Sequence, residues 1–343
     1  MLHRKQYRVA VRVTIMVLAL TLTACGTQEN TGSTESVKST ETVENTETVK
    51  GTETVESTET IENVEIIEAM VSESAAPQGT ANVTPQMQPV EYTNLQQITL
   101  DSTWEYADHS KINTGAAVLY RAPEESGRKG IVIGVNAGHG TVGGSKVKTL
   151  CHPDGSAKVT GGSTAMEAAA VSGGMTFQDG TPEREVTLRM AQILRDKLLS
   201  SGYDVLMLRD SEDVQLDNVA RTVICNNTAD CHIALHWDSG DGKNYDKGCF
   251  YISVPEALKN MEPVASHWQQ HDTLGTDLVE GLREQGATIY GKGHMGIDLT
   301  QTSYSTIPSV DMELGNAYSD HSDVILEQLA TGLLTGINTY FEQ

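Results

Sequence analysis

Basic residues are scarce in this sequence. It has 24 lysines and arginines against 46 aspartates and glutamates, which gives a formal net charge of −22 over 343 residues. Binding to a phosphate backbone requires clustered cationic side chains. The composition therefore argues against nucleic acid as a partner. The length allows one or two domains and is ample for a hydrophobic core.

Several motifs of enzymes and metal sites are also missing. The sequence contains no HExxH, no GxSxG and no pair of CxxC motifs, so it lacks the metallopeptidase helix, the serine nucleophile turn and the four-cysteine zinc site. Residues 291–296, GKGHMG, fit the pattern GxGxxG. The residues after them do not open a helix, and a dinucleotide site is therefore not expected there.

The longest apolar run near the N-terminus is too short for a membrane span. Basic residues in positions 4–12 precede an apolar run at 13–24, whereas a spanning helix needs about 20 residues. This pattern predicts a secretory signal over residues 1–25. Its end, Leu22-Thr23-Ala24-Cys25, resembles a bacterial lipobox, which implies lipidation of Cys25 and an anchor in the cell membrane. The alternative is an ordinary signal peptide that happens to contain a cysteine.

Residues 26–95 are predicted to be a disordered acidic tether. Between 33 and 68 they repeat with a period of six, as in STETVE and NTETVK. One apolar residue per repeat cannot bury enough surface to offset chain entropy, and the period fits neither a strand nor a heptad. A folded domain is expected over 96–343, with 96–130 adding edge strands or a small N-terminal unit.

From residue 131 the pattern alternates between strands and helices. Strands are predicted at 131–136, 203–209, 231–236, 248–254 and 309–314, and helices at 183–202, 214–226, 264–285 and 320–341. This alternation predicts a single α/β domain, core 131–341, whose mostly parallel twisted sheet is covered by helices on both faces. Ligands of such sheets bind at the carboxyl ends of the strands. An insertion at 141–182, rich in Gly, Ser, Thr and Ala, has the length of a lid or binding loop.

Candidate metal ligands stand at these strand ends. His139 follows the first strand, Glu183 opens the next helix, and His236 ends a later strand. Two imidazoles and a carboxylate form a common catalytic zinc set with one open position, where the metal activates water. Glu313, at the end of the 309–314 strand, would be the acid/base. Each of these residues could instead have a purely structural role. Two nearby residues also remain open as alternative ligands: Glu185 in place of Glu183, and His232 in place of His236.

The motifs VNAGHG, EREVTL, LMLRD, RTVICNN, LHWD and IPSVDMELGN occur in this order between 131 and 341. They resemble the zinc-dependent N-acetylmuramoyl-L-alanine amidases of the type 3 cell-wall group. The resemblance implies one Zn²⁺ bound by His139, Glu183 and His236, with Glu313 as catalytic acid/base, and favours these residues over their rivals. It also implies peptidoglycan as substrate. Together with the signal segment and lipobox, this predicts an exported membrane lipoprotein that faces the cell wall.

Three departures from the family pattern bear on the site. Asn136 replaces the usual aspartate and is expected to orient His139 from behind. Trp237 and Asp238 replace a small residue and an asparagine, and are expected to reshape the substrate groove. The 141–182 insertion is longer than typical, which suggests an inhibitory lid on which an activator protein acts. Two other functions remain open: a zinc peptidase that cuts within stem peptides, and a non-catalytic wall-binding lipoprotein.

Four cysteines remain besides Cys25. They are Cys151, Cys225, Cys231 and Cys249. Outside the cell they could form disulfides, with Cys225 and Cys231 nearest in sequence, and buried free thiols are the alternative.

Overall fold

The computed structural model describes residues 95–342, except for 163, 241 and 243. The predicted signal segment, Cys25 and almost all of the predicted tether lie outside the described residues. The described residues belong to a single structural unit. Among them, no helix has both the length and the hydropathy that crossing a bilayer requires.

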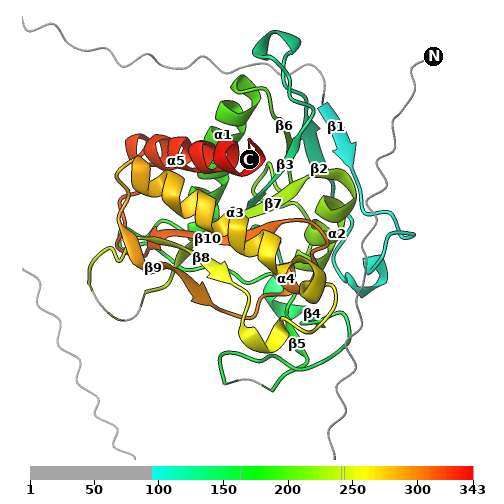
Figure 1. Ribbon diagram of the computed structural model, residues 1–343. Helices are drawn as coiled ribbons and strands as arrows, with labels where there is room; N and C mark the ends of the chain where they lie inside the picture. The colour runs from blue at the N-terminus through cyan, green and yellow to red at the C-terminus, as the bar shows by residue number, and fades with distance from the viewer. Residues whose placement is uncertain (1–94, 163, 241, 243, 343) are drawn as a thin grey trace, which may run out of the picture. The chain divides into compact units, whose positions relative to one another are not determined.

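An eight-stranded sheet forms the centre of the molecule, in the order β1-β2-β6-β3-β7-β10-β8-β9 (Figure 1). Its strands are β1 (Leu95–Ile98), β2 (Ala117–Tyr120), β3 (Val132–Ala137), β6 (Asp204–Met207), β7 (Cys231–Asp238), β8 (Cys249–Ser253), β9 (Ile289–Gly296) and β10 (Ser309–Asn316). The four central strands β6, β3, β7 and β10 are parallel neighbours. Strands β1 and β2 add an antiparallel edge, and β8 pairs antiparallel with β10. The predicted mostly parallel sheet is therefore confirmed.

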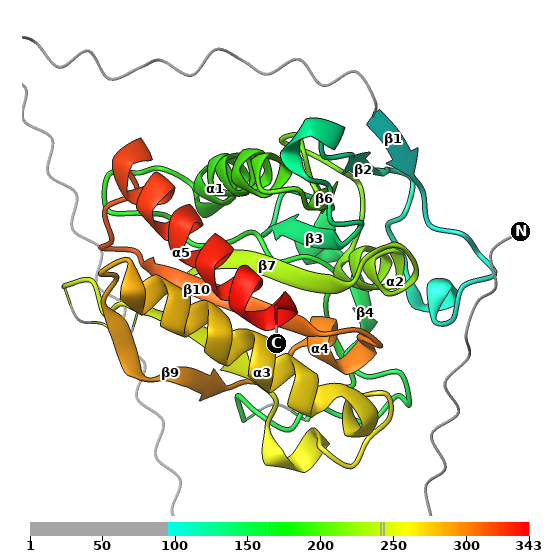
Figure 2. The ribbon, with the colours of Figure 1, turned by 45° about the horizontal axis from the view of Figure 1, so that its top comes forward.

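Helices cover both faces of this sheet, as predicted (Figure 2). On one face lie α1 (Glu183–Ser200), α3 (Val264–Glu284) and α5 (Asp323–Phe341), whose apolar side chains join the largest core cluster. On the other lie α2 (Asn218–Thr228) and the short α4 (Thr300–Tyr304). Short 3₁₀ turns occur at Ala107–His109, Glu124–Ser126, Gly144–Lys146 and Glu256–Leu258. The core-facing side chains of α1 and α5 are buried, except that Ile193 and Ile325 are only partly so.

Helix α2 begins four residues later than the predicted start at 214. Asp217 caps it by accepting a hydrogen bond from Ala220 N at 2.8 Å, the usual role of an aspartate at this position. Its other oxygen accepts from the backbone N–H groups of Lys111 and Ile112 at 2.6 and 2.9 Å. Asp217 thus ends the extended segment before the helix and ties the 96–130 region to the start of α2.

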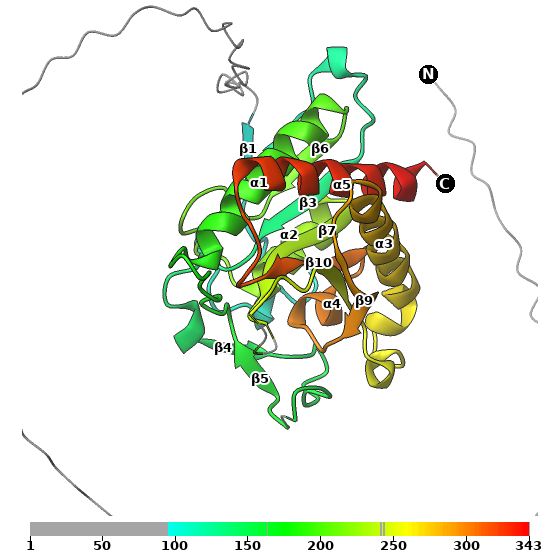
Figure 3. The ribbon, with the colours of Figure 1, turned by 90° about the vertical axis from the view of Figure 1, so that its left-hand side faces the viewer.

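The 141–182 insertion contains regular structure. Strands β4 (Lys148–Leu150) and β5 (Glu167–Ala169) form an antiparallel hairpin, which lies at the opposite end of the molecule from α1 and α5 (Figure 3). Between them, His152 Nε2 lies 2.9 Å from the carboxylate of Asp298, and both side chains are fully buried. The insertion is therefore fastened to the segment between β9 and α4.

The four cysteines of the described residues are buried and free. The disulfide alternative is therefore wrong for this structure, and the free-thiol alternative holds. Burial raises the pKa of Cys225 and Cys231, and raises the pKa of Cys249 to about 12. These thiols are packing residues that stay protonated at neutral pH.

Candidate metal centre

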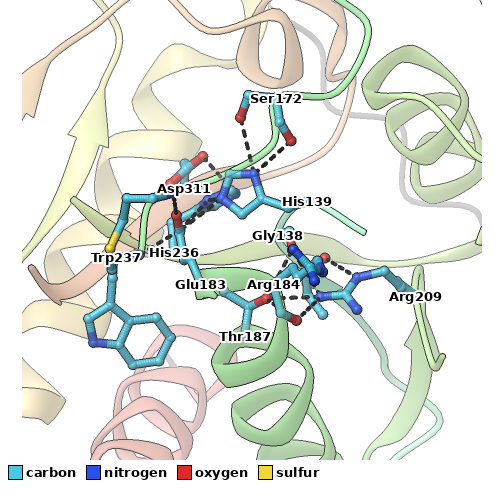
Figure 4. Close-up of polar contacts among 12 residues, drawn as sticks. Gly138, His139, Ser172, Glu183, Arg184, Thr187, Arg209, His236, Trp237 and Asp311 are labelled. Carbon is cyan, nitrogen blue, oxygen red and sulfur yellow. Dashed lines mark hydrogen bonds and ion pairs between the residues drawn. The ribbon is translucent and has the colours of Figure 1, made fainter. Parts of the chain in front are cut away.

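The structure brings His139, Glu183 and His236 together at the carboxyl ends of the central strands. His139 Nε2 lies 2.8 Å from Glu183 Oε1, and His236 Nδ1 lies 3.0 Å from His139 Nε2 and 3.2 Å from Glu183 Oε1 (Figure 4). A tetrahedral zinc ion with bonds of about 2.0–2.1 Å keeps its ligand atoms roughly 3.3 Å apart. The spacing and the donor types therefore fit a zinc ion.

Parallel pairing of neighbouring strands creates this convergence. In β3 and β7, Ala137 pairs with Leu235, so the loop after β3 and the end of β7 reach the same level. Glu183 arrives from the other side, as the first residue of α1. Its rival Glu185 is exposed and lies beside Arg184. The structure thus brings Glu183, and not Glu185, into the cluster.

His139 is held in an unusual backbone conformation. Its φ is 65°, in the left-handed region that residues other than glycine rarely adopt. Its Nδ1 donates to the backbone oxygen of Ser172 at 3.0 Å, and Ser172 Oγ lies at the same distance. This contact leaves Nε2 as the nitrogen that faces the cluster. Burial lowers the pKa of His139, which favours the neutral ring that metal binding requires.

Glu183 is ionised and fully engaged. Burial alone would raise the pKa of Glu183, but the hydrogen bonds with His139 and His236 outweigh it and hold the pKa well below its usual range. Oε1 also accepts from Trp237 N at 3.0 Å, and Oε2 accepts from Met175 N at 2.8 Å. The carboxylate is thereby oriented by two backbone donors from different segments.

Asp311, which the sequence analysis did not single out, stands behind His236. Its Oδ2 lies 3.6 Å from His236 Nε2, the ring nitrogen that points away from the cluster. Burial disfavours the charged ring, but Asp311 and Glu183 outweigh it and raise the pKa of His236 to about 10. A carboxylate behind a metal-binding histidine fixes the ring and increases its basicity. In the sequence, Asp311 could have been identified by its position two residues before Glu313, which places both side chains on the same face of β10.

His232, the rival of His236, lies outside the cluster. It is fully buried, and neither ring nitrogen has a hydrogen-bond partner among the described residues. Burial lowers the pKa of His232 to about 3. It lies four residues before His236, toward the amino end of β7 and away from the edge where the ligands meet.

Glu313 lies beside the cluster of His139, Glu183 and His236, and all four residues line one cavity. It is directly opposite His236 in the β10–β7 pairing. Glu313 Oε2 is buried and has no hydrogen-bond partner among the described residues. Burial, with Asp311 adding to it, raises the pKa of Glu313 well above its usual value. A buried carboxyl group whose protonated form is favoured in this way can accept a proton and later return it.

The cavity has a volume of about 660 Å³, and one wall of it comes from the insertion. Residues 171–175 line this wall. Gly174 has φ +81°, and a Cβ placed on it would lie 2.9 Å from His139 Cδ2 and 3.0 Å from Glu183 Oε2. Only glycine therefore allows this segment to pass so close to two of the metal-binding side chains.

The residues that depart from the family pattern take different places. Asn136 Oδ1 accepts from Arg221 at 3.0 Å, and the same guanidinium donates to the backbone oxygen of His139. The expected role of Asn136 in orienting His139 stays a prediction. Trp237 lines the cavity, but its indole packs in the core, 5.9 Å from the ring of Phe177, and points away from the imidazoles (Figure 4). Asp238 lines the cavity and forms an ion pair with Lys247.

Comparison with known proteins shows the family of this chain. The sequence model of the family described as N-acetylmuramoyl-L-alanine amidase matches residues 133–332, more than half of the chain. A search of curated proteins found no match.

Two crystal structures share the fold. The N-acetylmuramyl-L-alanine amidase Ami1 from Mycobacterium smegmatis is 17% identical with a TM-score of 0.52, over 62% of this chain and 97% of that chain. The apo form of Ami1 from Mycobacterium abscessus is 20% identical with a TM-score of 0.50, over 62% of this chain and 99% of that chain. From the family match, with the fold in agreement, this chain belongs to the N-acetylmuramoyl-L-alanine amidase family.

Proposed function

We propose that this protein is a zinc-dependent peptidoglycan hydrolase that cleaves the amide between N-acetylmuramic acid and the L-alanine of the stem peptide. The observation that carries the proposal is the placement of His139, Glu183 and His236 within 3.2 Å of one another, in the cavity that Glu313 also lines. This arrangement fits a metal site and a general base facing one substrate-sized space.

His139 Nε2, His236 Nδ1 and Glu183 Oε1 would hold the zinc ion. When bound, zinc supplies a Lewis acid that polarises the scissile carbonyl and activates water. Ser172 keeps His139 in the required tautomer, and Asp311 orients His236 from behind. Three protein ligands leave one position for water or substrate.

Glu313 would move the proton. Its Oε2, without a partner among the described residues, accepts the proton of the attacking water. The same oxygen then donates that proton to the amine of L-alanine as the amide bond breaks. Because burial raises the pKa of Glu313, the protonated carboxyl is accessible at neutral pH for the second transfer.

Export and membrane attachment complete the proposal. Residues 1–25 would direct secretion, lipidated Cys25 would anchor the protein, and residues 26–95 would span the distance between the membrane and the wall. The amidase domain would then extend from about residue 96 to the C-terminus. Control of the 141–182 insertion by an activator protein stays a prediction.

Product analysis tests the reaction. The full chain, purified in detergent, is incubated with peptidoglycan, with and without a chelator, and the released fragments are weighed by mass spectrometry. Free stem peptides that begin at L-alanine, lost with the chelator and restored by zinc, are expected. Fragments cut within the stem would instead establish a zinc peptidase, and binding without any release would establish a wall-binding protein.

A matched pair of variants tests Glu313. Glu313→Gln is expected to retain zinc and to lose at least about a hundredfold in kcat, because general acid–base catalysis is removed. Glu185→Gln, on the exposed first turn of α1, is the control and should behave as the wild type. A fully active Glu313→Gln enzyme would contradict the proposed mechanism.

A further inference from the structure

Two cationic side chains line the catalytic cavity within the described part of the chain, and they differ in exposure. Arg221 is fully buried and donates to Asn136, Thr141 and backbone oxygens. Lys158, from the insertion, is partly exposed and lines the same cavity as Glu313. Lys158 is thus the cation that a bound substrate can reach.

Lys158 is held in place by backbone contacts. Its N–H donates to Ala165 O at 3.0 Å, and its Nζ donates to the backbone oxygen of Asp298 at 2.9 Å. The Asp298 carboxylate is occupied by His152 and by Val159 N. An ammonium has three donors, and the described residues supply one acceptor to this one. The loop positions the ammonium while leaving donors for a ligand.

The charge of Lys158 is distinctive in its surroundings. The cavity is lined by the four carboxylates of Glu183, Asp238, Asp311 and Glu313, in a protein of net charge −22. Lys158 forms no ion pair among the described residues, but its charge contributes to lowering the pKa of the Asp298 carboxyl, the residue whose backbone oxygen it binds. An accessible cation that lines a cavity beside several carboxylates attracts an anionic group and orients it.

The covalent structure of the substrate decides whether its sugar half or its peptide half carries that anionic group. N-acetylmuramic acid has a single carboxyl, and this carboxyl forms the scissile amide with L-alanine. The sugar half of the substrate therefore offers no carboxylate, whereas the peptide half ends in one. A cavity of about 660 Å³ is large enough for several groups beyond the amide itself.

We propose that Lys158 is a specificity-determining residue that binds a free carboxylate of the stem peptide, on the leaving-group side of the scissile amide. The inference rests on the proposed function, since the cleaved bond defines the two halves. Lys158 Nζ forms a charge-assisted hydrogen bond with the carboxylate. Stem peptides whose carboxylates are amidated are accordingly poorer substrates.

A pair of soluble substrates tests this proposal in the full chain. One is an N-acetylmuramoyl peptide with free carboxylates, and the other is the same compound with all carboxyls amidated. Lys158→Met is expected to raise KM for the first substrate about tenfold, with kcat retained and no change for the second. Lys158→Arg should keep the preference. Lys148→Met, an exposed lysine of β4 outside the cavity, is the control.

Binding is measured separately from cleavage. The dissociation constants of the free stem peptide and of its amidated form are determined by calorimetry for the wild type, Lys158→Met and Lys158→Arg. Loss of discrimination in Lys158→Met alone supports the proposal. Equal weakening of both ligands, or no change for either, would overturn it, since Lys158 would then only brace the loop against Asp298. If the wild type cleaves neither substrate, the proposed function fails, and the binding constants still decide the role of Lys158.

Discussion

Arg221 Nη2 donates to the backbone oxygen of His139 at 2.6 Å. The same guanidinium reaches Ala137 O at 3.2 Å. From the other side, Arg209 donates to Gly138 O at 2.9 Å and to Ala137 O at 3.1 Å (Figure 4). Two buried arginines thus hold three consecutive carbonyls of the loop that presents His139. Their hydrogen bonds offset the unfavourable φ of 65° at His139.

Arg221→Lys is expected to weaken both folding and metal binding. Lysine keeps the charge but cannot span the same acceptors, so buried carbonyls lose their donors and the free energy of unfolding falls by about 3 kcal/mol. The zinc affinity should fall as well, because the His139 loop relaxes. Chemical denaturation and zinc titration measure the two effects. Arg189→Lys, a half-exposed arginine of α1, is the control, and an unchanged zinc affinity in Arg221→Lys would refute the role of Arg221 in positioning His139.

Asp311→Asn is expected to lower zinc affinity by roughly 10- to 100-fold, the usual effect of losing a carboxylate behind a ligating histidine. The amide preserves the shape of Asp311 but removes the charge that faces His236 Nε2 at 3.6 Å. Competition with a chromogenic chelator measures the affinity. Asp238→Asn, in the same cavity but paired with Lys247, should have a smaller effect. Equal affinities of the two variants would contradict this assignment.

Gly174→Ala is expected to impair the metal site through its backbone and its new methyl group. The residue has φ +81°, and the added Cβ would press on His139 and Glu183. We expect a loss of about 1–2 kcal/mol in unfolding free energy and weaker zinc binding. The neighbouring Gly173 has open space around the Cβ position, so Gly173→Ala is a matched control in both measurements. Equal zinc affinities in the two variants would show that the close approach of Gly174 is unimportant.

The interactions of Asp204, a residue away from the metal centre, predict that the stability of the fold depends on pH. Its carboxylate accepts from Arg128 Nη2 at 2.6 Å and from Arg121 Nη1 at 2.7 Å. Burial would raise the pKa of Asp204, but these hydrogen bonds outweigh it and lower the pKa below the usual value. The ionised form is therefore more stable in the folded than in the unfolded state. Its contribution is complete above the unfolded pKa of about 4 and is lost as pH falls through the lower folded pKa.

Asp204→Asn is therefore expected to lower the free energy of unfolding by about 2 kcal/mol at pH 7. The loss is smaller than for a fully buried ion pair, because both arginines are partly exposed to solvent. The difference from the wild type should shrink as pH falls below about 4. Urea denaturation across this pH range measures it. Asp196→Asn, which removes a partly buried carboxylate of α1 that pairs with Arg195, is the comparison. A difference that stays constant with pH would argue against the ionised carboxylate as its source.

The sequence alone was sufficient for the central strands and helices and for a set of candidate residues at the proposed metal centre. Its pattern left Glu185 and His232 open as alternatives, and the family resemblance favoured Glu183 and His236. Strands such as 131–136 and 309–314 are short apolar runs, and the helices between them show a 3.6-residue period, so local pattern predicts both. His139, His236 and Glu313 end such strands. Because parallel neighbours bring their carboxyl ends to one edge, their convergence follows from the order of the elements.

Tertiary structure decided which groups support those residues. Ser172 contacts His139 from the 141–182 insertion, which shows no helix or strand periodicity. Arg221 contacts the backbone of His139 from α2, 82 residues along the chain. Neither contact leaves a periodic signal, since each depends on how an insertion or a helix packs on the sheet. The start of α2 is a similar case, because Asp217 caps the helix while binding the backbone of residues 111–112. Local pattern specifies elements, whereas hydrogen bonds between distant segments exist only once those elements are packed.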